Sequence, residues 1–123
     1  MSLRIEVYPA VNGNQYVLLE GRLDSHTHEE FDARLAPLLA DGTRTLALDL
    51  GHLHYISSAG IRSILKARKA LAPRNGRVLL VHPQEQVRKV IELVQAVPLE
   101  QMFASGAEAD AYIDAMQRDI LGH

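Results

Sequence analysis

Two short apolar runs, separated by one amphipathic helical pattern, constrain the fold of this chain more than any other feature. The runs are "LALDL" (residues 46–50) and "RVLLVHP" (residues 77–83). Each has the length and composition of a strand buried on both faces, which is typical of parallel sheets. Between them, "SAGIRSILKARKAL" (residues 58–71) repeats apolar side chains at helical spacing. We therefore expect an α/β fold in which a crossover helix joins parallel strands.

Two further strands are expected before the first helix. The segment "LRIEVYPA" (residues 3–10) alternates apolar and charged side chains, which is the period of a strand with one buried face. Asn12, Gly13 and Asn14 tolerate left-handed backbone and can turn the chain into a second strand from Tyr16 to Leu23. These segments predict an N-terminal hairpin.

The next segment carries the signals of a helix. Thr27 and Glu30 have the spacing of a capping box. The apolar residues that follow share one helical face: Phe31, Leu35, Leu38 and Leu39. Pro37 lies inside this pattern and predicts a kink or a helix that begins late, because proline cannot donate a backbone hydrogen bond. Gly42 marks the end of the helix.

The C-terminal part continues the alternation. The segment "QEQVRKVIELVQ" (residues 84–95) predicts a helix, and a short last strand is expected near Leu99 to Phe103. A closing helix is expected over residues 106–121, with apolar residues Ala111, Ile113, Met116 and Ile120. We predict one domain over residues 1–123, with a mixed β-sheet in which an N-terminal hairpin is followed by alternating helices and strands.

The composition excludes several classes of function. The chain has no cysteine, which excludes disulfides, thiolate metal sites and cysteine nucleophiles. Its 13 basic and 15 acidic residues are interspersed, and aromatic residues are few, so no nucleic-acid partner is expected. No stretch approaches the roughly 20 apolar residues of a membrane span, and no signal peptide is recognisable. We expect a soluble, cytoplasmic protein without membrane insertion.

Binding chemistry is expected at the carboxyl ends of the parallel strands, where the sites of open α/β sheets collect. Three loops qualify: "DSHT" (residues 24–27), "GHLHYIS" (residues 51–57) and "HPQ" (residues 82–84). The middle loop brings Ser57 and Ser58 to a helix N-terminus. Serine is a preferred N-cap residue, so capping alone accounts for a serine there. The same helix start also favours an anion such as phosphate.

The residues after Ser58 allow two interpretations. The small side chains of Ala59 and Gly60 leave the first helical turn open to a large partner, or Gly60 only allows the helix to pack closely on a strand. Arg62, Lys66 and Lys69 share one side of the helix. They either extend a partner-facing surface or are simply solvated.

Neither a metal site nor an enzyme is expected. Five histidines lie in or next to the three loops: His26, His28, His52, His54 and His82. Imidazoles from converging loops can hold zinc or nickel, but no carboxylate spacing completes a known ligand set. Ser58 with a loop histidine could form a nucleophile and base, yet the chain lacks a nucleophile elbow and a glycine-rich phosphate loop. We predict a serine that is a substrate and not a catalyst, with no cofactor.

The segment "LALDLGHLHYISSAGIRSIL" (residues 46–65) resembles the signature of the STAS domain family, which includes bacterial anti-sigma factor antagonists. The match runs through Asp49 and Leu50 and then through residues 58–61. The segment "GRLDSHTHEEF" (residues 21–31) is similar to the family's Gly-x-Leu-Asp-x-x-Thr segment. The order of strands and helices agrees with the family from end to end.

This resemblance implies a protein-binding module that phosphorylation switches. It makes Ser58 the phosphoacceptor, with Ser57 as a minor alternative. The sequence departs from the family at one position: the residue before the acceptor is most commonly aspartate, and here it is Ser57. The implied partner is an anti-sigma factor with serine kinase activity, whose sequestration frees a sigma factor, and a phosphatase is a further implied partner. The expected partner-binding residues are Asp24, Ser25, Thr27, Ser57, Ser58, Ala59, Gly60, Arg62 and Lys66. The alternative is a STAS subunit of a signalling scaffold or lipid-transport complex that is not phosphorylated.

Overall fold

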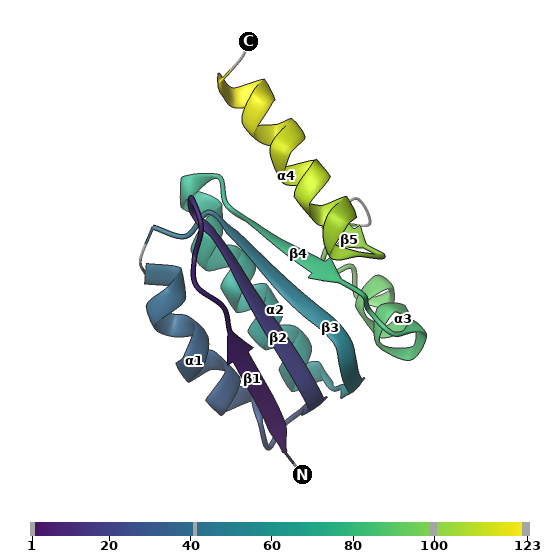
Figure 1. The fold of residues 1–123 in the computed structure, drawn as a ribbon. Coiled ribbons are helices and arrows are strands. Elements are labelled where there is room, and N and C mark those ends of the chain that lie inside the picture. Colours follow the sequence, from purple (N-terminus) through teal and green to yellow (C-terminus); the bar gives the residue numbers. More distant parts are fainter. Residues whose placement is uncertain (1, 41, 99–100, 122–123) are drawn as a thin grey trace.

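The chain folds into a mixed five-stranded sheet with helices on both faces (Figure 1). The computed structural model describes residues 2–40, 42–98 and 101–121. The strands lie in the order of the sequence and are β1 (Leu3–Val7), β2 (Asn14–Leu23), β3 (Thr45–Ile56), β4 (Arg77–Val81) and β5 (Met102–Phe103). The helices are α1 (His28–Ala40), α2 (Ser58–Leu71), a short 3-10 helix η1 (Ala72–Arg74), α3 (Glu85–Leu93) and α4 (Gly106–Leu121). The predicted α/β fold is confirmed.

Strand pairing follows the prediction. β1 and β2 pair antiparallel, and the turn between them places Asn12 at φ 53° and Gly13 at φ 81°, the left-handed conformation that these two residues tolerate. β2, β3, β4 and β5 then pair in parallel. Parallel strands need crossover connections, and the helices between the strands supply them.

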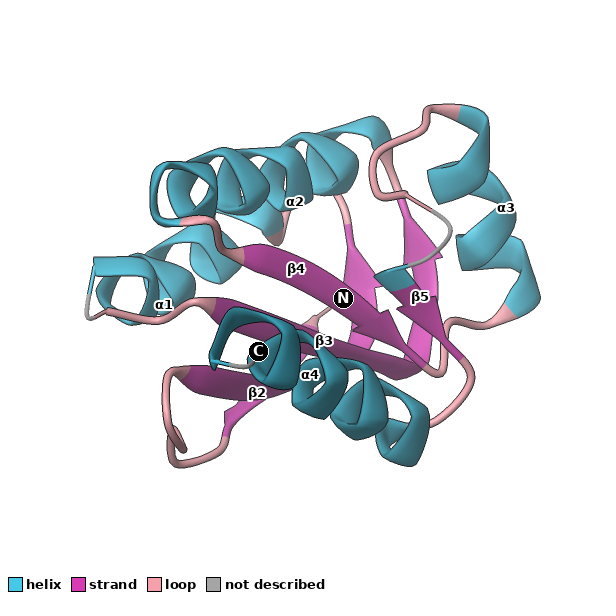
Figure 2. Ribbon diagram, turned by 90° about the horizontal axis from the view of Figure 1, so that it is seen from above, coloured by secondary structure: helices cyan, strands magenta, loops and turns pink. Residues whose placement is uncertain are grey.

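The two faces of the sheet are covered unequally. Figure 2 shows α1, α2 and α3 on one side of the sheet and α4 on the other. The main core lies on the three-helix side, and its largest fully buried side chains include Phe31 of α1, Leu48 of β3 and Ile64 of α2. A smaller cluster on the α4 side contains Ala47 and Ile113. The three-helix side therefore carries most of the apolar burial that holds α2 on the sheet.

β3 is longer than predicted, and this changes the position of the site. The segment expected as a loop (residues 51–57) is strand up to Ile56. Among the described strands it pairs only with β2, because β4 ends at Val81, opposite Asp49. Side-chain amides take the place of the missing strand. Gln84 Nε2 donates to the carbonyl of Gly51 at 2.8 Å, and Gln86 Nε2 donates to the carbonyl of His54 at 3.4 Å.

The first helix differs from its prediction in two respects. It begins at His28 and continues through Pro37 to Ala40, so the late start is wrong. The Thr27 hydroxyl does not form the expected capping box: it accepts from the amide of Asp24 at 2.9 Å and donates to the carbonyl of Arg22 at 2.9 Å. The predicted apolar face is correct, with Phe31 and Leu35 buried and Leu38 and Leu39 packed against the core.

The predicted apolar face of the closing helix is only partly correct. Ile113 is buried, but Ala111 is exposed, and Ala109 lies against the sheet in its place. The predictions for Leu99 and for the side chains of Met116 and Ile120 fall outside the described residues. In the part of the chain that the structure describes, no helix has the length and apolar character needed to cross a bilayer.

Candidate functional site

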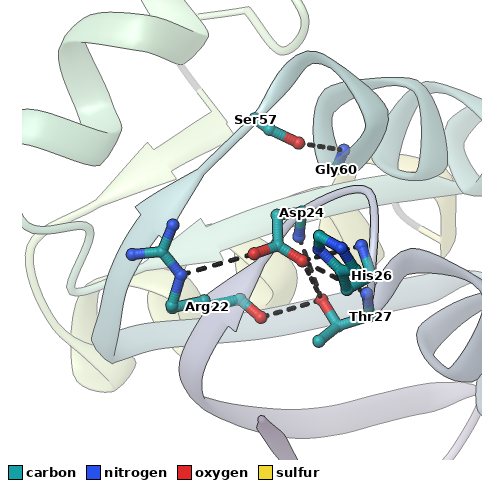
Figure 3. Close-up of polar contacts among 6 residues, drawn as sticks. All are labelled: Arg22, Asp24, His26, Thr27, Ser57 and Gly60. Carbon is teal, nitrogen blue, oxygen red and sulfur yellow. Dashed lines mark hydrogen bonds and ion pairs between the residues drawn. The ribbon is translucent and has the colours of Figure 1, made fainter. Parts of the chain in front are cut away.

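The two adjacent serines where β3 meets α2 have different environments, and Figure 3 shows that of the first, Ser57. Ser57 is the N-cap of α2: its backbone is extended, its amide donates to the carbonyl of Leu23 at 3.0 Å, and its hydroxyl accepts from the amide of Gly60 at 3.5 Å. The side-chain bond is long, so the cap is weak. Ser58 is the first residue of the helix and is exposed. Capping therefore explains the serine at position 57, whereas the hydroxyl of Ser58 does not cap the helix.

The first turn of α2 is packed tightly on the sheet. Ala59 and Gly60 are both buried. A Cβ atom at Gly60 would lie 2.7 Å from the carbonyl oxygen of Leu23 and 2.9 Å from Cγ1 of Ile56. The interpretation that these small residues leave the turn open is wrong, because the available space is already filled by β2 and β3. The close-packing interpretation of Gly60 is confirmed.

The loop between β2 and α1 (residues 24–27, the Asp24 loop) is fixed by an internal hydrogen-bond network around Asp24 (Figure 3). Asp24 Oδ1 accepts from the amide of His26 at 2.9 Å and from the amide of Thr27 at 3.2 Å. Asp24 Oδ2 lies 3.3 Å from Nε of Arg22. The hydrogen bond from the His26 amide, followed by those from Arg22 and Thr27, lowers the pKa of Asp24 against the opposing effect of burial. Asp24 is therefore an ionised and oriented carboxylate close to the start of α2.

The predicted contact residues of this loop divide into exposed and internal ones. Ser25 is exposed, whereas Thr27 is buried and uses its hydroxyl inside the loop. Thr27 thus shapes the loop and does not present its side chain to the surface.

The sequence gives no indication of an aromatic contact beside the Asp24 loop. The guanidinium carbon of Arg22 lies 4.2 Å from the ring centroid of Tyr55, a cation–π distance. The two residues are register partners on β2 and β3. This contact can be predicted only if residues 51–56 are recognised as a strand, because Arg22 and Tyr55 are paired only when that segment joins β2.

The predicted basic side of α2 is exposed along its length. Arg62, Lys66 and Lys69 all reach solvent, and Nζ of Lys66 lies 3.6 Å from Oδ2 of Asp32 on α1. A shallow groove of about 570 Å³ on this side is lined by Arg62, Leu65, Lys66, Arg68, Lys69 and Ala72. The α2 surface beyond Ser58 is therefore basic, with apolar carbon between the charges.

Asp49 belongs to a second polar network on the α4 side of the sheet. It accepts hydrogen bonds from the hydroxyl of Tyr16 and, at 3.0 Å, from the amide of Gly51, and Nδ1 of His82 lies 3.3 Å away. Burial by itself would raise the pKa of Asp49, but the hydrogen bonds from Tyr16, Gly51 and His82 outweigh it and lower the pKa. Burial and the Asp49 carboxylate together raise the pKa of Tyr16. Asp49 therefore stabilises the middle of β3, where the strand continues beyond β4.

The histidines of the three loops do not converge on one point. His82 contacts Asp49, whereas Nδ1 of His28 lies 3.7 Å from Oδ2 of Asp32 on the other side of the sheet. Within residues 2–40, 42–98 and 101–121, no group of three histidine, aspartate or glutamate side chains is arranged to hold a metal ion.

Comparison with known proteins assigns the family. The family model of the STAS domain matches residues 6–109. BtrV of Bordetella bronchiseptica, which bears the name of an anti-sigma factor antagonist, is 37% identical over 83 residues, covering 68% of this chain and 72% of BtrV. The anti-sigma F factor antagonist of Lysinibacillus sphaericus is 30% identical over 77 residues, covering 62% of this chain and 66% of that protein.

A solved structure supports the same assignment at the level of the fold. The anti-sigma factor antagonist SpoIIAA in its unphosphorylated form superimposes with a TM-score of 0.79 at 23% identity, over 91% of this chain and 97% of SpoIIAA. At this level of identity the likeness concerns the fold alone. The family model nevertheless spans most of the chain, and it includes both the Asp24 loop and the start of α2. The chain is a member of the STAS domain family.

Proposed function

We propose that this protein is an anti-sigma factor antagonist, a regulatory binding protein and not an enzyme, and that phosphorylation of Ser58 switches it off. Curated relatives at 37% and 30% identity bear the name of this function. The observation that carries the proposal is that only one of the two adjacent serines caps the helix. Ser57 caps α2, and the exposed Ser58 beside it is free to accept a phosphoryl group.

The partner in this proposal is an anti-sigma factor with serine kinase activity, in the cytoplasm, with a phosphatase that restores the unmodified serine. It binds the exposed surface around Ser58, which includes Ser25 and the basic side of α2 with Arg62 and Lys66. Asp24 contributes a fixed negative charge at the edge of this surface. Binding removes the anti-sigma factor from its sigma factor.

Phosphorylation would act locally. A phosphoserine adds about −1.5 to −2 charges at neutral pH. The hydroxyl of Ser58 is not the cap of α2, so the added group does not break the helix start. A closely docked partner would instead meet a new charge beside the carboxylate of Asp24. The proposed result is loss of binding with little change in the fold.

Affinity capture from source cells, followed by phosphosite mapping, tests the proposal. The expected result is capture of a serine kinase that, with ATP, adds one phosphate to Ser58. The Ser58→Ala variant should not be phosphorylated, and the matched Ser57→Ala and Ser25→Ala variants should still accept the phosphate at Ser58. Phosphate found only at other residues, or unaltered kinase binding by Ser58→Asp, contradicts the switch. Capture of a transporter ATPase without a kinase would support the non-phosphorylated STAS subunit instead.

A further inference from the structure

One cation lies a single helical turn from Ser58 and forms no ion pair with any carboxylate that the structure describes. Arg62 is exposed on α2, four residues after Ser58. The next cation on this side, Lys66, lies 3.6 Å from Asp32. Among the residues that the structure describes, no carboxylate lies within ion-pair distance of Arg62. Arg62 is therefore available to a new anion on the same side of the helix.

The spacing and order of the two residues favour an ion pair after phosphorylation. Residues four apart on a helix are neighbours on its surface, and an anion that precedes the cation is the better orientation. A phosphoserine presents strong acceptor oxygens, and the planar guanidinium of arginine matches them with two parallel donors. The other arginine near this end of the sheet, Arg22, is already held by Asp24 at 3.3 Å and by the ring of Tyr55.

We propose that Arg62 binds the phosphoryl group of phosphorylated Ser58 and so becomes unavailable to the partner. The proposal rests on the phosphorylation in the proposed function and describes how that switch works. In the unmodified protein, Arg62 lines the groove on the exposed side of α2 and offers its charge to an acidic residue of the partner. In the modified protein, the same guanidinium is neutralised within the helix. One phosphate then has two effects: it adds repulsion at Ser58 and removes an attractive cation one turn away.

The pair is tested with protein that carries phosphoserine at position 58, incorporated during translation so that no kinase is needed. A ³¹P NMR titration gives the second pKa of the phosphate in the parent, in Arg62→Gln and in Lys69→Gln. Both variants remove one exposed positive charge from α2, but Lys69 lies three turns from Ser58. From the strength of helical ion pairs, the phosphate pKa in the parent should be lower than in Arg62→Gln by about 0.2 to 0.4.

The outcomes are distinct. A lower phosphate pKa in the parent and in Lys69→Gln than in Arg62→Gln supports the ion pair. Equal phosphate pKa values in the parent and Arg62→Gln overturn it, and so does an equal shift in both variants, because a general loss of charge would then explain the result. Failure to find a kinase for Ser58 counts against the proposed function and is independent of this titration.

Discussion

The Asp24 loop and the start of α2 lie side by side, yet they use their polar side chains in opposite ways. In the loop, Asp24, Thr27 and Arg22 bond to one another and to backbone, so these polar groups hold the loop in one conformation. At the start of α2, Ser58 and Arg62 are exposed and outside this network. A rigid frame thus lies beside an exposed hydroxyl and an exposed cation. In the proposed function, the rigid loop holds the surface in place and the exposed side chains of Ser58 and Arg62 are accessible to a kinase and a partner.

The largest effect is expected where α2 packs on this frame. Gly60→Ala places a Cβ atom 2.7 Å from the carbonyl oxygen of Leu23, and this backbone atom cannot move without shifting β2. We expect the free energy of unfolding to fall by about 1–3 kcal/mol, which urea denaturation measures. Gly106→Ala is the matched control, because no atom of the described residues lies within 4 Å of its added Cβ. Equal unfolding midpoints for the two variants would contradict the tight packing.

A somewhat smaller loss is expected from Thr27→Val, which keeps the shape of the side chain and removes the hydroxyl. The amide of Asp24 and the carbonyl of Arg22 then lose a partner in a partly buried site. The expected loss is about 1–2 kcal/mol in the free energy of unfolding. Ser25→Ala, at an exposed position of the same loop, should change it by no more than about 0.5 kcal/mol. If both variants behave alike, the loop is not the rigid frame described.

The charge of Asp24 predicts a dependence of stability on pH. Its pKa is lowered in the folded protein, chiefly by the hydrogen bond from the His26 amide. The carboxylate therefore contributes stability above the ordinary aspartate pKa of about 3.9, and this contribution is lost as the pH falls through the folded-state value. Urea midpoints measured from pH 6 to pH 3 should fall less steeply for Asp24→Asn than for the parent. An unchanged slope in Asp24→Asn would count against the network.

The smallest effects are expected at the two serines themselves. Ser57→Ala removes a weak cap with a 3.5 Å hydrogen bond and should cost about 0.5–1 kcal/mol. Ser58→Ala should lie within about 0.5 kcal/mol of the parent, because the side chain is exposed. Thermal or urea unfolding of the two variants side by side distinguishes them. A greater loss for Ser58→Ala would assign a structural task to the residue proposed as the phosphoacceptor.

Much of the fold follows from local patterns in the sequence. Period-2 alternation predicts β1, and the Asn12–Asn14 turn predicts the hairpin. Helical spacing places Phe31 and Leu35 in the core. These predictions hold because each rests on residues that are neighbours in the same element, where side-chain direction follows from the element's own geometry.

The site is less predictable because its contacts join elements that are distant in the sequence. "GHLHYIS" contains glycine and histidine without regular alternation, and it pairs with one strand through an irregular register, so its strand character is hidden. The Arg22–Tyr55 contact depends on that register. The hydrogen bond between Tyr16 and Asp49 joins β2 to β3, two strands that local patterns predict separately and without their pairing. Nor could the sequence tell which serine caps α2, since a shift of one residue in the helix start exchanges their roles.

We propose that phosphorylation of Ser58 prevents partner binding while the fold around it stays unchanged. Calorimetric titration of the purified anti-sigma factor into unmodified protein and into protein with phosphoserine at position 58 tests it most directly. We expect a loss of affinity of about 100-fold or more on modification, because the phosphate adds negative charge to the docked surface and takes the Arg62 cation away from the partner, with unchanged amide NMR shifts outside the Asp24 loop and α2. Equal affinities for the two forms would contradict the claim.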